Sequence, residues 1–279
     1  MRSLSQPKAV MPMFKESVVL GQYYPVDSLM HRLDGRNKII ITLLYLASLF
    51  VASRGLDFAI LTLLFVLMVV FSRVPVRLIW RGLRFVIIVV LLTVIFNIFF
   101  YPGEEIWRWG ILRITREGIS HGLLMGLRIL LLISAGTLLT LTTKPMDLTD
   151  AMERLLSPLQ IIRVPAHEIA MVMSIALRFI PTLMEELERI ILAQRARGAS
   201  FADKKLGERM RQILPLVVPL FVSAFRRADE LAQAMEAKCY HGGKGRSHWR
   251  RSRWQLRDTL VFAFFVLVLA YMIYGRVCG

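Results

Sequence analysis

Cysteine is scarce in this sequence, which has only Cys239 and Cys278 among its 279 residues. The two lie at opposite ends of the last hydrophobic segment, a placement that argues against a disulfide framework and excludes a CxxC metal site. The 5 histidines are scattered and form no HExxH pattern or other paired ligand spacing. The sequence therefore predicts no metal site and gives no support for redox chemistry.

Motifs that would indicate an enzyme are also missing. The chain has no GxSxG nucleophile motif and no GxxxxGK[ST] loop to hold the phosphates of ATP. The pair His167-Glu168 lacks the second histidine four residues later that a zinc protease would need. We therefore expect no catalytic residues and no cofactor, and any ATP-driven process would need another subunit.

The balance of residue types indicates a membrane protein. Hydrophobic residues make up 56% of the chain and the mean hydropathy is +0.54, more than a soluble globular domain usually has. The net charge of +16 is compatible with nucleic-acid binding, but the basic residues cluster beside apolar segments, where they orient spans and meet anionic lipids. We expect the partner of this charge to be the lipid bilayer and not nucleic acid.

Long apolar runs predict about five transmembrane helices. Each run approaches the ~20 residues that cross a bilayer once its flanking residues are included. In lipid, only a helix satisfies all backbone hydrogen bonds within one segment, so the predicted fold class is all-α. The runs are Ile39–Ala52, Leu56–Phe71, Phe85–Phe100, Leu123–Leu141 and Leu260–Tyr274.

Polar residues are rare within these runs. Arg128 is the main charged exception, which disfavours an ion-coupled carrier because intramembrane charges usually mark an ion pathway. Polar side chains expected to form hydrogen bonds between helices are those of Asn97, Thr137, Thr140, Thr142 and Thr143.

Loop charges predict the orientation of the spans. Positive residues are retained on the cytoplasmic side, and they gather before the first span, between the second and third, and through residues 142–258. The N-terminus and this long region are therefore expected in the cytoplasm, with the C-terminus outside. This divides the chain into residues 1–141 with four spans, a cytoplasmic region 142–258, and a last span in 259–279.

The region 142–258 is predicted to contain two long amphipathic helices, at about 166–198 and 213–240, because apolar residues recur there at steps of three and four. Their apolar stretches Ile169–Ile180 and Ile213–Phe225 could also cross the membrane as a pair. We favour helices at the cytoplasmic surface, because Pro215, Pro219 and the charged stripes of the two helices argue against a pair of spans. After them, residues 241–245 contain three glycines that predict a hinge.

The ends of these two helices share a pattern. The first ends in Ala196-Arg197-Gly198 and the second in Ala237-Lys238-Cys239. A cation at a helix C-terminus is favoured by the helix dipole, so ordinary capping explains both. The pattern equally fits two cations that project into two similar acidic sockets on a partner.

Several separate motifs in this order make the chain resemble the transmembrane T component of energy-coupling factor (ECF) transporters, the CbiQ/EcfT family. The resemblance covers nearly the whole chain. The motifs are Gly21-Gln22-Tyr23-Tyr24, His31-Arg32-Leu33-Asp34, Ser174-Ile175-Ala176-Leu177-Arg178-Phe179-Ile180-Pro181, Ala196-Arg197-Gly198 and Ala234-Met235-Glu236-Ala237.

The resemblance implies a scaffold in the bacterial cell membrane that joins two ABC-type ATPases to a small membrane-embedded S component, which binds a vitamin or similar micronutrient. In the family, two Ala-Arg-Gly motifs dock in the ATPases. Ala196, Arg197 and Gly198 match the first, whereas Lys238 and Cys239 depart from the second and lose the planar guanidinium and the glycine. Phe179, Val217, Phe221 and Ala224 form the hypothesised surface that transmits motion to the S component.

Three alternatives to this role make different predictions. A substrate-conducting permease subunit of another ABC importer would crosslink to substrate directly. An intramembrane enzyme would need a polar cluster shared by two spans, and none is visible in the sequence. A membrane-tethered nucleic-acid binder would use Lys244 to Arg257 and show salt-dependent binding.

Overall fold

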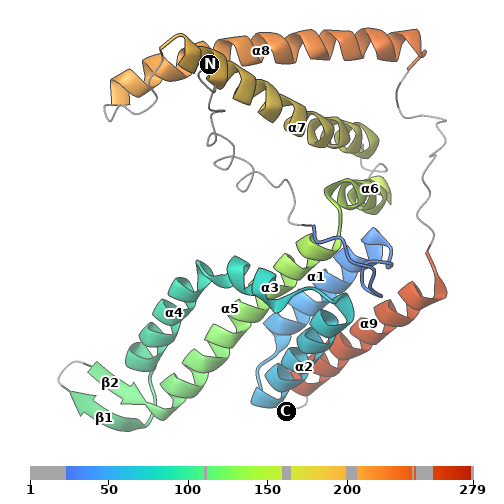
Figure 1. Ribbon diagram of the computed structural model, residues 1–279. Coiled ribbons are helices and arrows are strands. Elements are labelled where there is room, and N and C mark those ends of the chain that lie inside the picture. Colours follow the sequence, from blue (N-terminus) through green and yellow to red (C-terminus); the bar gives the residue numbers. More distant parts are fainter. Residues whose placement is uncertain are drawn as a thin grey trace, which may run out of the picture. The chain divides into compact units, whose positions relative to one another are not determined.

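The computed structural model describes residues 23–109, 112–158, 165–198, 206–240, 242 and 254–277. The predictions for Gly21-Gln22, for most of the hinge at 241–245, for residues 244–253 and for Cys278 lie outside these ranges. Within them, the chain is helical except for one short hairpin (Figure 1). The predicted all-α fold of a polytopic membrane protein is confirmed.

The chain divides into two compact units, residues 1–151 with 251–279 and residues 152–250. The first unit contains most of the apolar helices. They are α1 (Gly35–Val51), α2 (Gly55–Ser72), α3 (Val76–Leu83), α4 (Val86–Phe100), α5 (Arg116–Thr142) and α9 (Leu256–Val277), and α6 (Pro145–Leu156) contains the boundary between the units.

The core of the first unit forms around α1. Tyr45 and Leu49 of this helix are fully buried and pack with Leu61 of α2 and Phe265 of α9. The Tyr45 hydroxyl donates a hydrogen bond of 3.1 Å to the carbonyl of Leu61, which satisfies the one polar atom of that side chain. A second apolar cluster joins α3 to the C-terminal half of α5 through Ile79, Leu83, Leu138 and Leu141, with Val74 before α3.

The helices that could cross a membrane differ in part from those expected. By length and composition, four described helices qualify, namely α2, α5, α7 (Ala166–Ala196) and α9, and α3 with α4 adds one if this pair, bent by 61°, is a single span. The expected first span corresponds to α1, which has 17 residues, the lower end of spanning lengths. α7 qualifies because its apolar stretch from Ile169 to Ile180 forms part of a long continuous helix.

Three glycines of α5 bring it against α4. A Cβ atom built on Gly122 would lie 3.2 Å from the Cβ of Asn97 and 3.2 Å from the carbonyl oxygen of Val94. Gly118 and Gly126 meet α4 in the same way. The spacing is the small-xxx-small pattern that lets membrane helices approach closely, and the sequence analysis missed it.

The polar side chains in α4 and α5 do not join helices as expected. Asn97 donates to the carbonyl of Thr93, Thr137 to that of Ile133, and Thr142 to that of Leu138. Each bond stays within its own helix, because a threonine hydroxyl reaches the carbonyl one turn earlier without ordering a partner. The expectation of interhelical bonds was wrong for these residues.

The segment between α4 and α5 contains an unexpected antiparallel hairpin, β1 (Glu105–Trp109) and β2 (Leu112–Thr115). The Thr115 side chain then accepts a hydrogen bond of 3.1 Å from the Gly118 amide and caps α5.

The second unit consists of the last part of α6, α7 and α8 (Leu206–Ala237), and α7 packs against α8. The structure begins α8 before the expected residue, Ile213.

Candidate functional site

The two long helices of the second unit end in the same local structure. In α7, Arg197 is the C-cap residue, Gly198 follows with φ +87°, and the Gly198 amide donates to the carbonyl of Arg195 at 3.0 Å. In α8, Cys239 has φ +53° and its amide donates to the carbonyl of Glu236 at 2.8 Å. Both are left-handed terminations in which the residue after the cap closes the last turn.

The shared termination gives Lys238 the place that Arg197 has on α7. Each cation directly precedes the left-handed residue, and both side chains are exposed. In the described part of the chain, neither has an ion pair within 4.0 Å. The two helices therefore each present a positive side chain at a C-terminal end, where the helix dipole favours a cation. Because both side chains are exposed, they can reach an acidic partner.

Cys239 reaches the left-handed conformation without being glycine. An L-residue in this region brings its Cβ atom close to the following carbonyl, which costs roughly 1 to 2 kcal/mol. The amide of Tyr240 offsets part of this cost by donating to the carbonyl of Met235 at 3.0 Å. The departure from Ala-Arg-Gly at this end thus changes the residue types but keeps the backbone geometry.

The apolar residues predicted to transmit motion do not share one packed surface. Phe179 of α7 is half-buried, and Ala224 of α8 is also partly covered. In contrast, Val217 is 36% exposed and Phe221 is 59% exposed. Phe221 stacks loosely on Phe225 of the same helix, with ring centroids 6.2 Å apart.

The packed side of α8 is one that the sequence analysis did not identify. Ser223 is only 6% exposed, and Arg227 of the same helix lies 3.8 Å from Glu186 of α7. A serine within an apolar stretch gave no signal in the hydrophobic pattern. Ser223 lies on the buried side, whereas Val217 and Phe221 keep 36% and 59% of their surface exposed.

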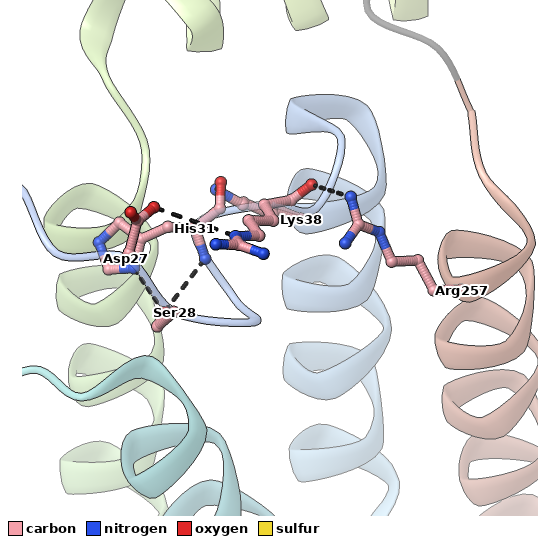
Figure 2. A network of polar contacts seen from close by, with 6 residues as sticks. Asp27, Ser28, His31, Lys38 and Arg257 are labelled. Carbon is pink, nitrogen blue, oxygen red and sulfur yellow. Dashed lines mark hydrogen bonds and ion pairs between the residues drawn. The ribbon is translucent and has the colours of Figure 1, made fainter.

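A polar network in the first unit joins the N-terminal segment to three helices, and Figure 2 shows the part of it around His31, Lys38 and Arg257. The imidazole of His31 lies between two partners, with Nδ1 2.6 Å from the Ser28 hydroxyl and Nε2 3.0 Å from the Tyr24 carbonyl. Burial lowers the pKa of His31, Lys38 lowers it further, and the Tyr24 carbonyl acts in the opposite direction. The neutral imidazole therefore fits this position.

Lys38 and Arg257 extend this network to α5 and α9. The Lys38 Nζ donates to the carbonyls of Thr142 at 2.9 Å and His31 at 3.3 Å. Arg257 donates to the carbonyl of Arg32 at 3.0 Å, as Figure 2 also shows. The motif from His31 to Asp34 thus lies where α1, α5 and α9 meet, next to the start of α6.

In the described residues, no cluster of three or more histidine, cysteine or acidic side chains could hold a metal ion. His167 pairs with Glu153 at 2.8 Å, and this contact joins α6 to α7.

Comparison with known proteins adds a consistent set of matches. The model of the cobalt transport protein family, CbiQ, matches residues 27–249. Curated relatives named energy-coupling factor transporter transmembrane protein EcfT are similar along almost their whole length. The protein of Ruminiclostridium cellulolyticum is 46% identical over 92% of this chain and 96% of its own length. The protein of Bacillus subtilis is 43% identical over 94% of this chain and 99% of its own length.

Proposed function

Because the chain belongs to the CbiQ/EcfT family of transmembrane components of ECF transporters, we propose that it couples ATP hydrolysis by two ABC-type ATPases to movement of a membrane-embedded S component. It is a component of a membrane transporter and not an enzyme. The S component would bind the substrate, a vitamin or a similar micronutrient. The complex would lie in the bacterial cell membrane with the N-terminus and residues 142–258 in the cytoplasm.

The matched ends of α7 and α8 carry this proposal. Arg197 and Lys238 are exposed cations at equivalent positions of two left-handed terminations. Two equivalent protrusions suit a dimer that presents the same acidic groove twice. Ala196 and Ala237, the small residues before the cations, would let each helix end enter its groove without steric conflict.

The exposed apolar side chains of α8 supply the second half of the mechanism. Val217 and Phe221 are partly exposed, and an S component could bury their exposed area. α8 packs against α7, Arg227 pairs with Glu186 between the two helices, and Ser223 lies on the buried side of α8. A change in the distance between the two ATPase grooves would then alter the α7 to α8 packing and shift the bound S component, since packed helix pairs rearrange between discrete states.

The two cations should contribute unequally. A guanidinium offers a planar fork of donors that can bind a carboxylate through two hydrogen bonds, whereas an ammonium acts as a compact point charge. Arg197 would therefore hold its ATPase more tightly than Lys238 holds the other.

Co-purification of the tagged chain with its partners tests the proposal. Arg197→Glu should reduce the recovery of ABC ATPases, and Lys238→Glu should reduce it to a smaller extent. Arg189→Glu provides the matched control, since it makes the same charge change on an exposed residue of α7 away from the helix end. Full ATPase recovery and full uptake with Arg197→Glu would contradict docking at this residue.

A separate readout tests the role of the apolar surface. Phe221→Ser should leave ATPase recovery unchanged and should reduce recovery of the S component, because it removes exposed apolar area from α8 without touching either helix end. Substrate that crosslinks to this chain in the absence of any S component would instead indicate a substrate-conducting subunit.

A further inference from the structure

A polar cavity of about 190 Å³ lies in the first unit, where α1 ends and α2 begins. Its walls come from the turn between these helices, from the N-terminal half of α5 and from the C-terminal end of α9. Ser53, His121, Arg128 and Arg276 provide polar groups. This cavity contains none of the residues assigned to coupling.

Two buried polar atoms in the cavity wall have no partner. The Arg128 Nη2 donates to the carbonyl of Ala52 at 2.6 Å, and Nη1 lies 3.6 Å from the sulfur of Met125. The Nε of Arg128 and the Nδ1 of His121 are both buried without a hydrogen bond. Buried polar groups are nearly always satisfied in folded proteins, so these two atoms mark this wall as one where polar partners are missing.

The charge of the cavity is positive and is not neutralised by the chain. Arg128 and Arg276 both line it, and in the part of the chain that the structure describes, neither has a carboxylate within 4.0 Å. Two cations beside one cavity repel each other unless an anion lies between them. Guanidinium groups match the oxygens of a phosphate with paired hydrogen bonds.

The position of the cavity along the helices favours a lipid as the source of the phosphate. Arg128 donates to Ala52, the residue that caps the C-terminal end of α1, so the cavity lies at the level where spans end and headgroups begin. Phe50, Phe58 and Leu124 form its apolar wall, and the side chain of Phe50 is 64% exposed. A phosphate held there would leave acyl chains beside these side chains.

We propose that this cavity binds the phosphate of an anionic phospholipid, with Arg128 and Arg276 as its ligands. Arg128 has two roles: its Nη2 satisfies the carbonyl of Ala52, the residue that caps α1, and its positive charge attracts the phosphate. Arg276 makes no hydrogen bond among the described residues and serves the phosphate alone. The bound lipid would hold the C-terminal end of α9 close to the turn between α1 and α2. This turn lies at the end of the first unit that is opposite to α6.

Lipid binding to the full chain in detergent, counted by native mass spectrometry, tests the site. The probes are phosphatidylglycerol, phosphatidylcholine and inorganic phosphate. We expect saturable binding of one phosphatidylglycerol, weaker binding of phosphatidylcholine, and about a tenfold loss of phosphatidylglycerol affinity in Arg276→Gln, as expected for a lost hydrogen bond to a charged group. Arg276 is substituted instead of Arg128 because this change keeps the hydrogen bond from Arg128 to the Ala52 carbonyl at the end of α1.

Arg77→Gln is the matched control, since it removes one exposed cation from α3, which does not line the cavity. Equal effects of Arg77→Gln and Arg276→Gln would overturn the site in favour of diffuse attraction. Equal affinity for phosphatidylcholine and phosphatidylglycerol would overturn the preference for an anionic lipid. Binding of inorganic phosphate that depends on Arg276, without lipid binding, would support a phosphate site and overturn the lipid as its source.

Discussion

Asn37 and Asp258 are 221 positions apart in the sequence, yet the side-chain amide of Asn37 donates a hydrogen bond of 2.9 Å to the Asp258 carbonyl. The Asp258 carboxylate in turn accepts hydrogen bonds from the amides of Asp34 at 3.1 Å and Gln255 at 2.9 Å. These contacts join the start of α1 to the start of α9. Asp258, Asp34 and Asn37 are only 1%, 6% and 0% exposed, so water has little access to replace the contacts among these three residues.

Asp258→Ala should therefore destabilise the first unit strongly. The substitution leaves the buried amide of Asp34 unpaired and removes the cap on α9, at a combined cost of about 2 to 4 kcal/mol. Thermal unfolding of the purified chain in detergent would measure this as a lower melting temperature. Asp27→Ala is the control, because the Asp27 side chain is 92% exposed and its loss should change little. Equal melting temperatures for the two variants would contradict the role of Asp258.

Gly122→Ala should separate α5 from α4. The new methyl group would lie 3.2 Å from a backbone oxygen of α4, which cannot move aside easily, and such overpacking costs about 1 to 3 kcal/mol. Gly136→Ala is a control in the same helix, since a Cβ atom there meets nothing within 4 Å. It should be neutral or stabilise the helix by up to about 1 kcal/mol. Thermal unfolding of both variants distinguishes close packing from helix propensity, and similar effects would rule out the packing explanation.

Cys239→Gly should strengthen the end of α8. Glycine adopts a positive φ without the Cβ conflict, although it also gains entropy in the unfolded chain. The expected net gain is about 0.5 to 1 kcal/mol, the difference between these two effects. Slower hydrogen exchange at the amides of Cys239 and Tyr240 would report it. Ala237→Gly is the control, because Ala237 lies two residues earlier and within the helix, where glycine weakens the helix and should speed hydrogen exchange. Faster exchange in both variants would mean that Cys239 is not strained.

His31 should make the N-terminal network sensitive to acid. Its pKa in the folded chain is below the ordinary value of 6.5 because of burial. The unfolded chain therefore takes up a proton first, so the stabilisation by His31 is complete above pH 6.5 and is lost as the pH falls through the folded pKa. The difference in melting temperature between the native chain and His31→Gln should thus shrink from pH 8 to pH 5. A difference that is constant or grows in acid would contradict this sign.

The sequence predicted the helical architecture well, because the bilayer leaves the backbone few choices. Apolar runs near Leu56–Phe71 and Leu260–Tyr274 became α2 and α9. The bounds were harder to judge. The helix expected at about 166–198 is α7, but α8 begins at Leu206 and not at the expected Ile213. The polar residues before Ile213 have no apolar periodicity, so the hydrophobic pattern alone did not include them in the helix.

The sequence by itself determined the all-α membrane fold, the family, and the pairing of a cation with each long helix end, because local periodicity and short motifs encode them. Only the tertiary structure decided that Cys239 takes the same left-handed conformation as Gly198, that Ser223 lies on the buried side of α8, and that Arg128 and Arg276 line one cavity. These features depend on backbone angles and on contacts between residues far apart in the chain. Such contacts leave no periodic signal, since each arises from how separately encoded helices pack.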